Sequence, residues 1–203
     1  MRREPGSSTE RLEQFWVGEF GDAYTQRNRN SIERREFWRA LTDAHSFESV
    51  LEVGCNAGEN LVALSEFVDE RMLAGIDVNE RALALAREAL PDADLRKTPA
   101  RELQFPDAAF DLVFTAMVLI HQPDETLDTV MAEIVRCSRR YVLAVEYEAP
   151  EQVDVPYRGH KGVLFKRPYA DLYRTAFPEL RPVASGFMGQ GGWDDVTWTL
   201  FRR

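Results

Sequence analysis

Residues 50–61, VLEVGCNAGENL, and residues 74–79, AGIDVN, decide the fold of this chain. An apolar run that ends in a glycine-containing turn, an amphipathic stretch and a second apolar run that ends in Asp77 are typical of one βαβ half of a nucleotide-binding sheet. Gly54 and Gly58 lack a Cβ atom, so the backbone can turn sharply after the first strand and a ligand can lie against it. These segments predict a parallel α/β sheet with a nucleotide site.

Asp77 follows Gly58 at about the 20-residue separation at which an acidic residue reaches a ribose in dinucleotide-binding folds. A carboxylate can accept hydrogen bonds from both hydroxyls of a cis-diol. The turn departs from the pattern G-x-G-x-x-G, because Asn56 and Glu59 stand where its second and third glycines would be. Asn tolerates the left-handed backbone angles of such a turn, but the carboxylate of Glu59 would repel a pyrophosphate. The turn therefore favours an adenosine-bearing cofactor that is not a dinucleotide.

A family resemblance follows from these residues. The segment LEVGCNAG at residues 51–58, with Asp77 at the end of the next strand, resembles the first two motifs of class I S-adenosylmethionine-dependent methyltransferases. Residues 110–121, FDLVFTAMVLIH, are similar to their fourth-strand motif. Further blocks resemble the methylases that accompany pseudaminic acid biosynthesis genes, namely residues 15–24 (FWVGEFGDAY), 157–160 (YRGH), 164–167 (LFKR) and 194–198 (DDVTW). This resemblance runs from about residue 12 to the C terminus.

The fold expected from these patterns is an α/β Rossmann-like three-layer sandwich. Alternating strands and helices with a final pair of strands indicate a mostly parallel sheet, and the family resemblance implies seven strands that end in an antiparallel one, plus N-terminal helices. Strands are predicted at 49–53, 72–77, 94–97, 110–115, 141–147, 181–187 and 196–201, and helices at 59–68, 80–90, 124–137 and 169–177. Residues 1–10 are predicted to be a flexible N terminus, and residues 11–203 a single methyltransferase domain with a helical cap at 11–45 and an acceptor loop at 148–167.

Composition narrows the classes of partner. The 203 residues suit one domain, and the net charge of −9 disfavours nonspecific binding to nucleic acid or anionic membranes. No apolar run is long enough for a membrane span, which predicts a cytoplasmic protein. The two cysteines and three histidines lack the spacing of a metal site, so no metal is expected. The sequence leaves monomer and homodimer open.

Ligands of open α/β sheets bind at the carboxyl ends of the strands. By the family resemblance, the end of the first strand holds the methionine part of the cofactor, Asp77 holds the ribose hydroxyls and the end of the third strand holds the adenine. Asp77 could instead only cap a helix, and Glu52 could orient the glycine turn or meet the ligand ammonium. Tyr24, Arg27 and Asn28 share one helix face, where they could cap the methionine carboxylate or the acceptor, or could form a solvated face. The candidate cofactor-binding residues are Trp16, Tyr24, Arg27, Glu52, Gly54, Asn56, Asn60, Asp77, Val78, Thr98, Pro99, Ala100 and Met117.

His121 is the candidate catalytic residue. It follows a strand end, close to where a methyl donor should lie, and a neutral imidazole can accept a proton near pH 7. The alternative is a histidine that caps the next helix or only packs. A local positive cluster after residue 147 suggests an anionic acceptor, although ion pairs with nearby carboxylates would also explain it. The candidate acceptor-binding residues are His121, Tyr147, Tyr157, Arg158, His160 and Lys166.

The sequence thus favours transfer of a methyl group from S-adenosylmethionine, with S-adenosylhomocysteine as product, to a hydroxyl or amine of a small polar acceptor. A sugar acid, a nucleotide-linked sugar and a natural-product intermediate are the acceptors considered. A sulfonium methyl group is already electrophilic, so the protein must mainly align the reactants and exclude water. Two alternatives stay open: a nucleotide-dependent oxidoreductase, and an S-adenosylmethionine-binding protein without catalytic activity.

Overall fold

The computed structural model describes residues 7–27, 34–189 and 195–203. Seven strands form one sheet in the order β3-β2-β1-β4-β5-β9-β8, and only β9 runs antiparallel to the others. The strands are β1 (Val50–Val53), β2 (Leu73–Asp77), β3 (Asp94–Lys97), β4 (Phe110–Ala116), β5 (Ser138–Glu146), β8 (Arg181–Met188) and β9 (Val196–Arg202). The predicted mostly parallel sheet with an antiparallel strand is confirmed.

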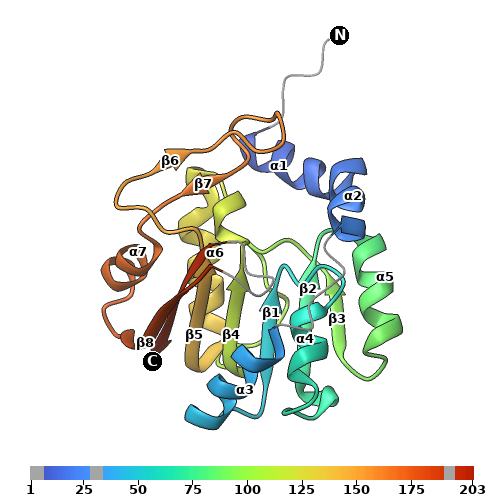
Figure 1. The fold of residues 1–203 in the computed structure, drawn as a ribbon, viewed down its shortest axis with the longest axis vertical. Helices are drawn as coiled ribbons and strands as arrows, with labels where there is room; N and C mark the ends of the chain where they lie inside the picture. The colour runs from blue at the N-terminus through green and yellow to red at the C-terminus, as the bar shows by residue number, and fades with distance from the viewer. Residues whose placement is uncertain (1–6, 28–33, 190–194) are drawn as a thin grey trace.

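Helices cover both faces of the sheet (Figure 1). One face packs on α3 (Arg34–Ala44), α4 (Glu59–Leu64) and α5 (Glu80–Ala89), and the other on α6 (Asp124–Cys137) and α7 (Tyr169–Ala176). The central strands β1 and β4 are mostly apolar and buried along nearly their whole length, because helices cover both of their faces. Helix α4 is shorter than its predicted range, since the N–H groups of Phe67 and Val68 both donate to the Leu64 carbonyl and the chain leaves the helix as a turn.

The strand order places a ligand site beside β1. From β1 the chain adds β2 and β3 on one side and β4 and β5 on the other, so the connections leave β1 and β4 in opposite directions. Such a switch point opens a crevice at the carboxyl ends of the strands. Two short 3₁₀ turns flank the strands, namely η1 (Glu70–Met72) before the amino end of β2 and η2 (Leu119–His121) after the carboxyl end of β4.

Two N-terminal helices, α1 (Ser8–Val17) and α2 (Glu19–Arg27), lie across this end of the sheet (Figure 1). Helix α1 begins before the predicted cap boundary at residue 11, because Ser7 and Glu10 form a capping box in which each side chain accepts from the other's backbone N–H. Thr9 then donates from both its N–H and its hydroxyl to Glu125 of α6, at 2.8 and 2.7 Å. The flexible N terminus predicted for residues 1–10 otherwise falls on residues 1–6, outside the described residues.

The predicted acceptor loop contains a small second sheet. Strands β6 (Val153–Asp154) and β7 (Phe165–Lys166) pair antiparallel, and Figure 1 shows them at the same end of the molecule as α1. Two-residue strands are too short for an alternating pattern, so the prolines and glycines of the segment predicted only a loop. Between these strands, Tyr157 and His160 exchange two backbone hydrogen bonds across a tight turn.

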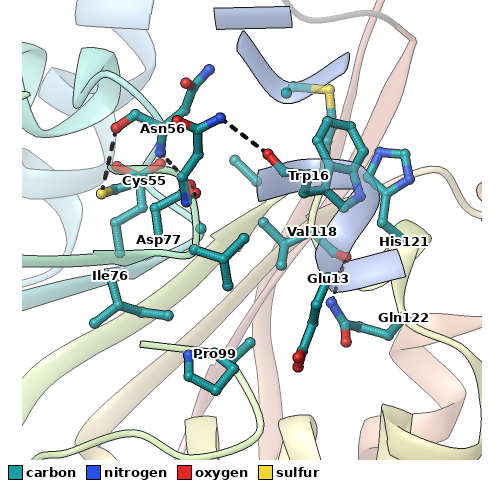
Figure 2. A pocket seen from close by; sticks show the side chains of 18 of the residues that line it. Glu13, Trp16, Cys55, Asn56, Ile76, Asp77, Pro99, Val118, His121 and Gln122 are labelled. Carbon is teal, nitrogen blue, oxygen red and sulfur yellow. Dashed lines mark hydrogen bonds between the residues drawn. The ribbon is translucent and has the colours of Figure 1, made fainter. Parts of the chain in front are cut away.

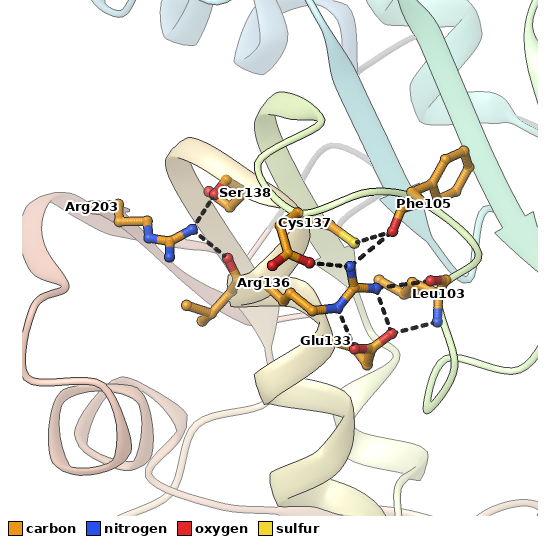
Figure 3. A network of polar contacts seen from close by, with 9 residues as sticks. Leu103, Phe105, Glu133, Arg136, Cys137, Ser138 and Arg203 are labelled. Carbon is orange, nitrogen blue, oxygen red and sulfur yellow. Dashed lines mark hydrogen bonds and ion pairs between the residues drawn. The ribbon is translucent and has the colours of Figure 1, made fainter.

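Arg136, near the end of α6, forms hydrogen bonds with the loop between β3 and β4 (Figure 3). Its guanidinium pairs with Glu133 and donates to the carbonyl oxygens of Leu103 and Phe105, at 2.9 and 2.8 Å. The Glu133 carboxylate in turn accepts from the Leu103 N–H at 2.7 Å. This network fixes the segment that begins at the carboxyl end of β3.

Candidate active site

A cavity lies at the carboxyl ends of β1, β2 and β4, under α1 and α2. Figure 2 shows Asn56 and Asp77 on one side of it and Trp16 and His121 on the other. Of the sequence candidates, the cavity is lined by Trp16, Tyr24, Glu52, Gly54, Asn56, Asn60, Asp77, Val78, Thr98, Pro99, Ala100, Met117 and His121. The candidates come from six different segments, which the fold brings together at one site.

The glycine turn has the left-handed backbone that the sequence implied. Gly54 and Asn56 have φ angles of 76° and 49°. The Thr25 hydroxyl of α2 donates to the Asn56 side-chain oxygen at 2.6 Å, which ties the helical cap to the turn. A Cβ atom on Gly54 would lie 2.4 Å from the Cγ2 atom of Val118. The turn therefore has no room for a side chain at Gly54.

Substitution of Gly54 by Ala is expected to lower both stability and cofactor affinity. The new methyl group must displace Val118, and the positive φ adds strain of about 1 kcal/mol, so the free energy of unfolding should fall by roughly 1–3 kcal/mol. Thermal unfolding and calorimetric titration with S-adenosylhomocysteine measure the two effects. Gly159 is a matched control, because a Cβ there meets nothing within 4 Å although φ is also positive. Equal loss of affinity in both variants would contradict this account.

Asp77 is held by the turn on one side and by the next helix on the other. Its carboxylate accepts from the N–H groups of Asn56 and Asn79, each at 2.8 Å and each on a different oxygen. Burial raises the pKa of Asp77, and backbone hydrogen bonds from Asn79, Asn56 and Val78 oppose that shift. Asp77 also lines the cavity. The helix-cap alternative fits less well, because Asn79 and not Asp77 caps α5 through the Ala82 N–H.

Glu52 is almost fully buried and lines the cavity at the end of β1. One carboxylate oxygen, Oε1, accepts from the Asn60 side-chain amide at 2.6 Å, while Oε2 is buried without a hydrogen-bond partner among the described residues. Burial raises the pKa of Glu52 to about 8. Arg34, at the start of α3, also lines the cavity and donates to the Asn60 side-chain oxygen at 3.1 Å. The three side chains form one polar chain at the end of β1.

The segment after β3 forms another wall. The Thr98 hydroxyl donates to the Glu102 carbonyl at 2.9 Å, so it is already used within its own turn. Next to Ala100, Arg101 makes a two-pronged ion pair with Glu13 of α1, at 2.9 and 3.2 Å, and both side chains line the cavity. The helical cap thus closes on the segment where the family resemblance implies an adenine site.

The turn after β4 has an unusual backbone. Met117 has a φ of 58°, which costs energy for a residue with a side chain, and it lines the cavity. The following N–H groups of Val118, Leu119 and Ile120 all donate to the buried carboxylate of Glu146, at 3.2–3.3 Å. Burial raises the pKa of Glu146 to about 7. A buried carboxylate at the end of β5 therefore fixes the turn that carries His121.

His121 joins this turn to the loop after β6. Its Nδ1 is hydrogen-bonded to the carbonyl oxygen of Val163, and its ring centroid lies 4.5 Å from that of Trp16. Burial lowers the pKa of His121 to about 4, which keeps the ring neutral at physiological pH. It does not cap the next helix with its side chain, since Pro123 occupies the N-cap of α6.

Some candidates do not line the cavity. Arg27 is exposed at the end of α2, with its guanidinium over the Phe20 ring, because the inner face of that helix is formed by Gly21, Tyr24 and Thr25. Asn28 lies outside the described residues. The other candidates off the cavity wall are Tyr147, Tyr157, Arg158, His160 and Lys166.

An aromatic cluster links the outer candidates to the cavity. Phe15 and Phe20 stack with ring centroids 4.0 Å apart, and the His160 ring lies 4.9 Å from that of Phe15. The ring centroid of Tyr157 lies 5.9 Å from that of Phe20 and 5.8 Å from that of His121. The turn at residues 157–160 therefore closes against the helical cap just outside the cavity.

Comparison with known proteins places this site in context. Residues 50–140 match the family described as "Methyltransferase domain". A phosphatidylethanolamine N-methyltransferase from Cereibacter sphaeroides is 39% identical over 97 residues, covering 45% of this chain and 45% of that protein. A 27-O-demethylrifamycin SV methyltransferase from Amycolatopsis mediterranei is 27% identical over 126 residues, covering 56% of this chain and 45% of that protein. The chain spans about half the length of these curated relatives.

A solved structure shares the fold along the whole chain. The 1,6-didemethyltoxoflavin-N1-methyltransferase of Burkholderia thailandensis, with bound 1,6-didemethyltoxoflavin and S-adenosylhomocysteine, superposes with a TM-score of 0.73 at 16% identity, covering 100% of this chain and 93% of that one. In the described residues of the present chain, no helix is long and apolar enough to cross a membrane. The same residues contain no group of three or more His, Cys, Asp or Glu side chains that could hold a metal ion.

Proposed function

We propose that this chain, whose residues 50–140 form a class I S-adenosylmethionine-dependent methyltransferase domain, transfers a methyl group to a small polar acceptor. The observation that carries the proposal is the pair of carboxylates at the ends of neighbouring strands. Asp77 offers two oxygens to a ribose cis-diol, and the unpartnered oxygen of Glu52 offers a negative charge to an ammonium group once its carboxyl ionises on binding.

The remaining cavity residues fit the same cofactor. Arg34 brings a guanidinium to the end of β1, where it can pair with the carboxylate of the methionine part. This assigns to Arg34 the role that the sequence suggested for Arg27. Gly54 keeps the turn open, and Thr98, Pro99 and Ala100 with Val78 form the walls of the adenine site.

When bound, S-adenosylmethionine supplies an electrophilic methyl group on a sulfonium. The task of the protein is then to position the acceptor and to exclude water. Helices α1 and α2 cover the cavity, and the Glu13–Arg101 and Thr9–Glu125 contacts hold that cover in place. His121 contributes a neutral ring nitrogen at the acceptor end.

The positive charges of Arg158 and Lys166, in the predicted acceptor loop at residues 148–167, support an anionic acceptor, such as a sugar acid or a nucleotide-linked sugar. Arg158 sits at the tip of the 157–160 turn with a strained φ of 48°, and the Lys166 ammonium lies 5.5 Å from the centre of the Tyr147 ring. The neighbouring Arg167 is different, because it is buried and pairs with Asp124 at 2.7 Å. The narrower resemblance to methylases that accompany pseudaminic acid biosynthesis genes supports the same acceptor class.

Replacing both Arg158 and Lys166 by Ala should raise the KM for an anionic acceptor by roughly tenfold or more, because two charge-assisted contacts are lost. The affinity for S-adenosylhomocysteine should stay the same, since neither side chain lines the cavity. Steady-state kinetics and calorimetry measure the two quantities. The R174A variant is the matched control, because Arg174 is exposed and pairs with Asp171 on α7. An unchanged acceptor KM in the double variant would rule out this role for the loop.

The two alternative functions make different predictions. An oxidoreductase needs room for a pyrophosphate, but the Glu59 side chain lines the cavity at the start of α4. A binding protein without catalytic activity would bind S-adenosylhomocysteine and methylate nothing. Incubation with methyl-labelled S-adenosylmethionine and a polar metabolite extract should yield a labelled small molecule. Cofactor binding without any labelled product would favour the inactive binding protein.

A further inference from the structure

The acceptor end of the cavity holds two polar atoms that have no hydrogen-bond partner in the described part of the chain. One is the indole N–H of Trp16, which is buried and unpartnered. The other is Nε2 of His121, since only Nδ1 of that ring is hydrogen-bonded. The two rings lie 4.5 Å apart between centroids, and both line the cavity (Figure 2).

The partner of Nδ1 determines what Nε2 can do. A backbone carbonyl can only accept a hydrogen bond, so Nδ1 must carry a proton to bond with the Val163 oxygen. A neutral imidazole has one protonated nitrogen, and therefore Nε2 has a free lone pair. Burial keeps the ring neutral, because it lowers the pKa of His121 to about 4. The site thus presents one donor, from Trp16, and one acceptor, from His121.

Among a hydroxyl, an amine, an ammonium and a carboxylate, only the hydroxyl satisfies both atoms and can still attack a methyl carbon. A hydroxyl oxygen has two lone pairs and one hydrogen, so it can accept from Trp16, donate to His121 and keep a lone pair for the reaction. A neutral amine has a single lone pair, which Trp16 and the methyl carbon would compete for. An ammonium has none, and a carboxylate has no hydrogen to donate to His121.

We propose that the reacting group of the acceptor is a hydroxyl, held between the Trp16 indole N–H and Nε2 of His121, so that the protein is an O-methyltransferase. This inference rests on the proposed function and specifies its acceptor atom. The hydroxyl oxygen gains a bond to the methyl carbon, the donor sulfur keeps the electron pair of the broken bond, and the hydroxyl proton passes to Nε2. The hydrogen bond from Nδ1 to Val163 then holds the imidazolium in place.

Nuclear magnetic resonance of the ¹⁵N-labelled protein tests the proposal without knowledge of the natural acceptor. The protein is saturated with S-adenosylhomocysteine, and phenol, aniline and benzoate are added separately as probes of similar shape. Phenol should shift both the Trp16 indole resonance and the His121 Nε2 resonance, whereas aniline and benzoate should not shift the pair. The resonances of His45 and Trp198 are internal controls, because neither residue lines the cavity.

The spectra also report the tautomer directly. An Nε2 of His121 that carries the proton, a phenol that fails to shift both resonances, or an amine or carboxylate that shifts both would each overturn the proposal. The W16F variant keeps an aromatic ring but removes the donor, and it should weaken phenol binding about three- to tenfold. Unchanged phenol affinity in W16F would also count against the proposal. Failure of S-adenosylhomocysteine to bind the wild-type protein would instead overturn the proposed function itself.

Discussion

Substitution of Asp77 by Asn is expected to raise the dissociation constant for S-adenosylhomocysteine about a hundredfold or more. Hydrogen bonds to a charged group contribute about 1.5–3 kcal/mol each, and a tenfold change in affinity corresponds to about 1.4 kcal/mol. The Asn side chain has one acceptor oxygen, which must serve the N–H groups of Asn56 and Asn79 as well as the ribose. Calorimetric titration measures the loss.

The 2′-deoxy analogue of S-adenosylhomocysteine separates ribose binding from damage to the turn. It should bind the wild-type protein more weakly than the parent ligand, but the two ligands should bind D77N with similar affinity. The D171N variant is the matched control, because Asp171 is exposed and lies on α7. The ribose assignment would be wrong if the 2′-hydroxyl contributed equally in D77N and in the wild-type protein.

Substitution of Glu52 by Gln is expected to stabilise the ligand-free protein at pH 8 and to weaken cofactor binding. Burial raises the folded-state pKa of Glu52 from 4.5 to about 8, with further small increases from Glu59 and Asp77 and opposite effects from Asn60 and Arg34. In the unfolded chain this carboxyl ionises near its ordinary value. The folded state therefore binds more protons between about pH 4.5 and 8, and stability falls as pH rises through that window.

The difference in the free energy of unfolding between E52Q and the wild type should thus grow from near zero at about pH 4.5 to on the order of a few kcal/mol at pH 8. Denaturant unfolding at several pH values measures it, with E66Q as a control because Glu66 is exposed and pairs with Arg35.

Binding of a ligand ammonium should ionise Glu52 and release a proton at pH 7. Titrations in two buffers should show that E52Q releases fewer protons than the wild type; equal release would exclude Glu52 as the ammonium partner.

The core of the fold could be predicted because the central strands are buried on both faces. The strands β1, β2 and β4 consist largely of buried apolar residues, and α6 carries a buried stripe at helical spacing. The β6–β7 pair could not be predicted in this way. Its strands have two residues each, and contacts such as the hydrogen bond from the Val155 N–H to the Leu164 carbonyl leave no periodic pattern in the sequence.

Candidate site residues on strand ends could be identified from sequence, whereas residues on the cap could not be ranked. Asp77 is the last residue of β2, and Gly54 and Met117 directly follow β1 and β4, so their positions follow from the topology of the sheet. Arg27 and Arg34 look alike in sequence, and only the packing of α3 against α4 places Arg34 beside Asn60.

Two further contacts differ in whether the sequence could have predicted them. The sequence Ser7-Ser8-Thr9-Glu10 carries the S-x-x-E signature of a capping box, which would have placed the start of α1. The Glu13–Arg101 pair joins residues far apart along the chain, and no local pattern indicates it.

Titration of the wild-type protein with S-adenosylhomocysteine and, separately, with NAD tests the central claim most directly. The carboxylates of Asp77 and Glu52, which we propose bind a ribose and an ammonium, line the cavity together with Glu59, whose charge would repel a pyrophosphate. We expect S-adenosylhomocysteine to bind with one site per chain and NAD to give no measurable heat. Binding of NAD with the higher affinity, or no binding of S-adenosylhomocysteine, would contradict the assignment of this cavity to a methyl donor.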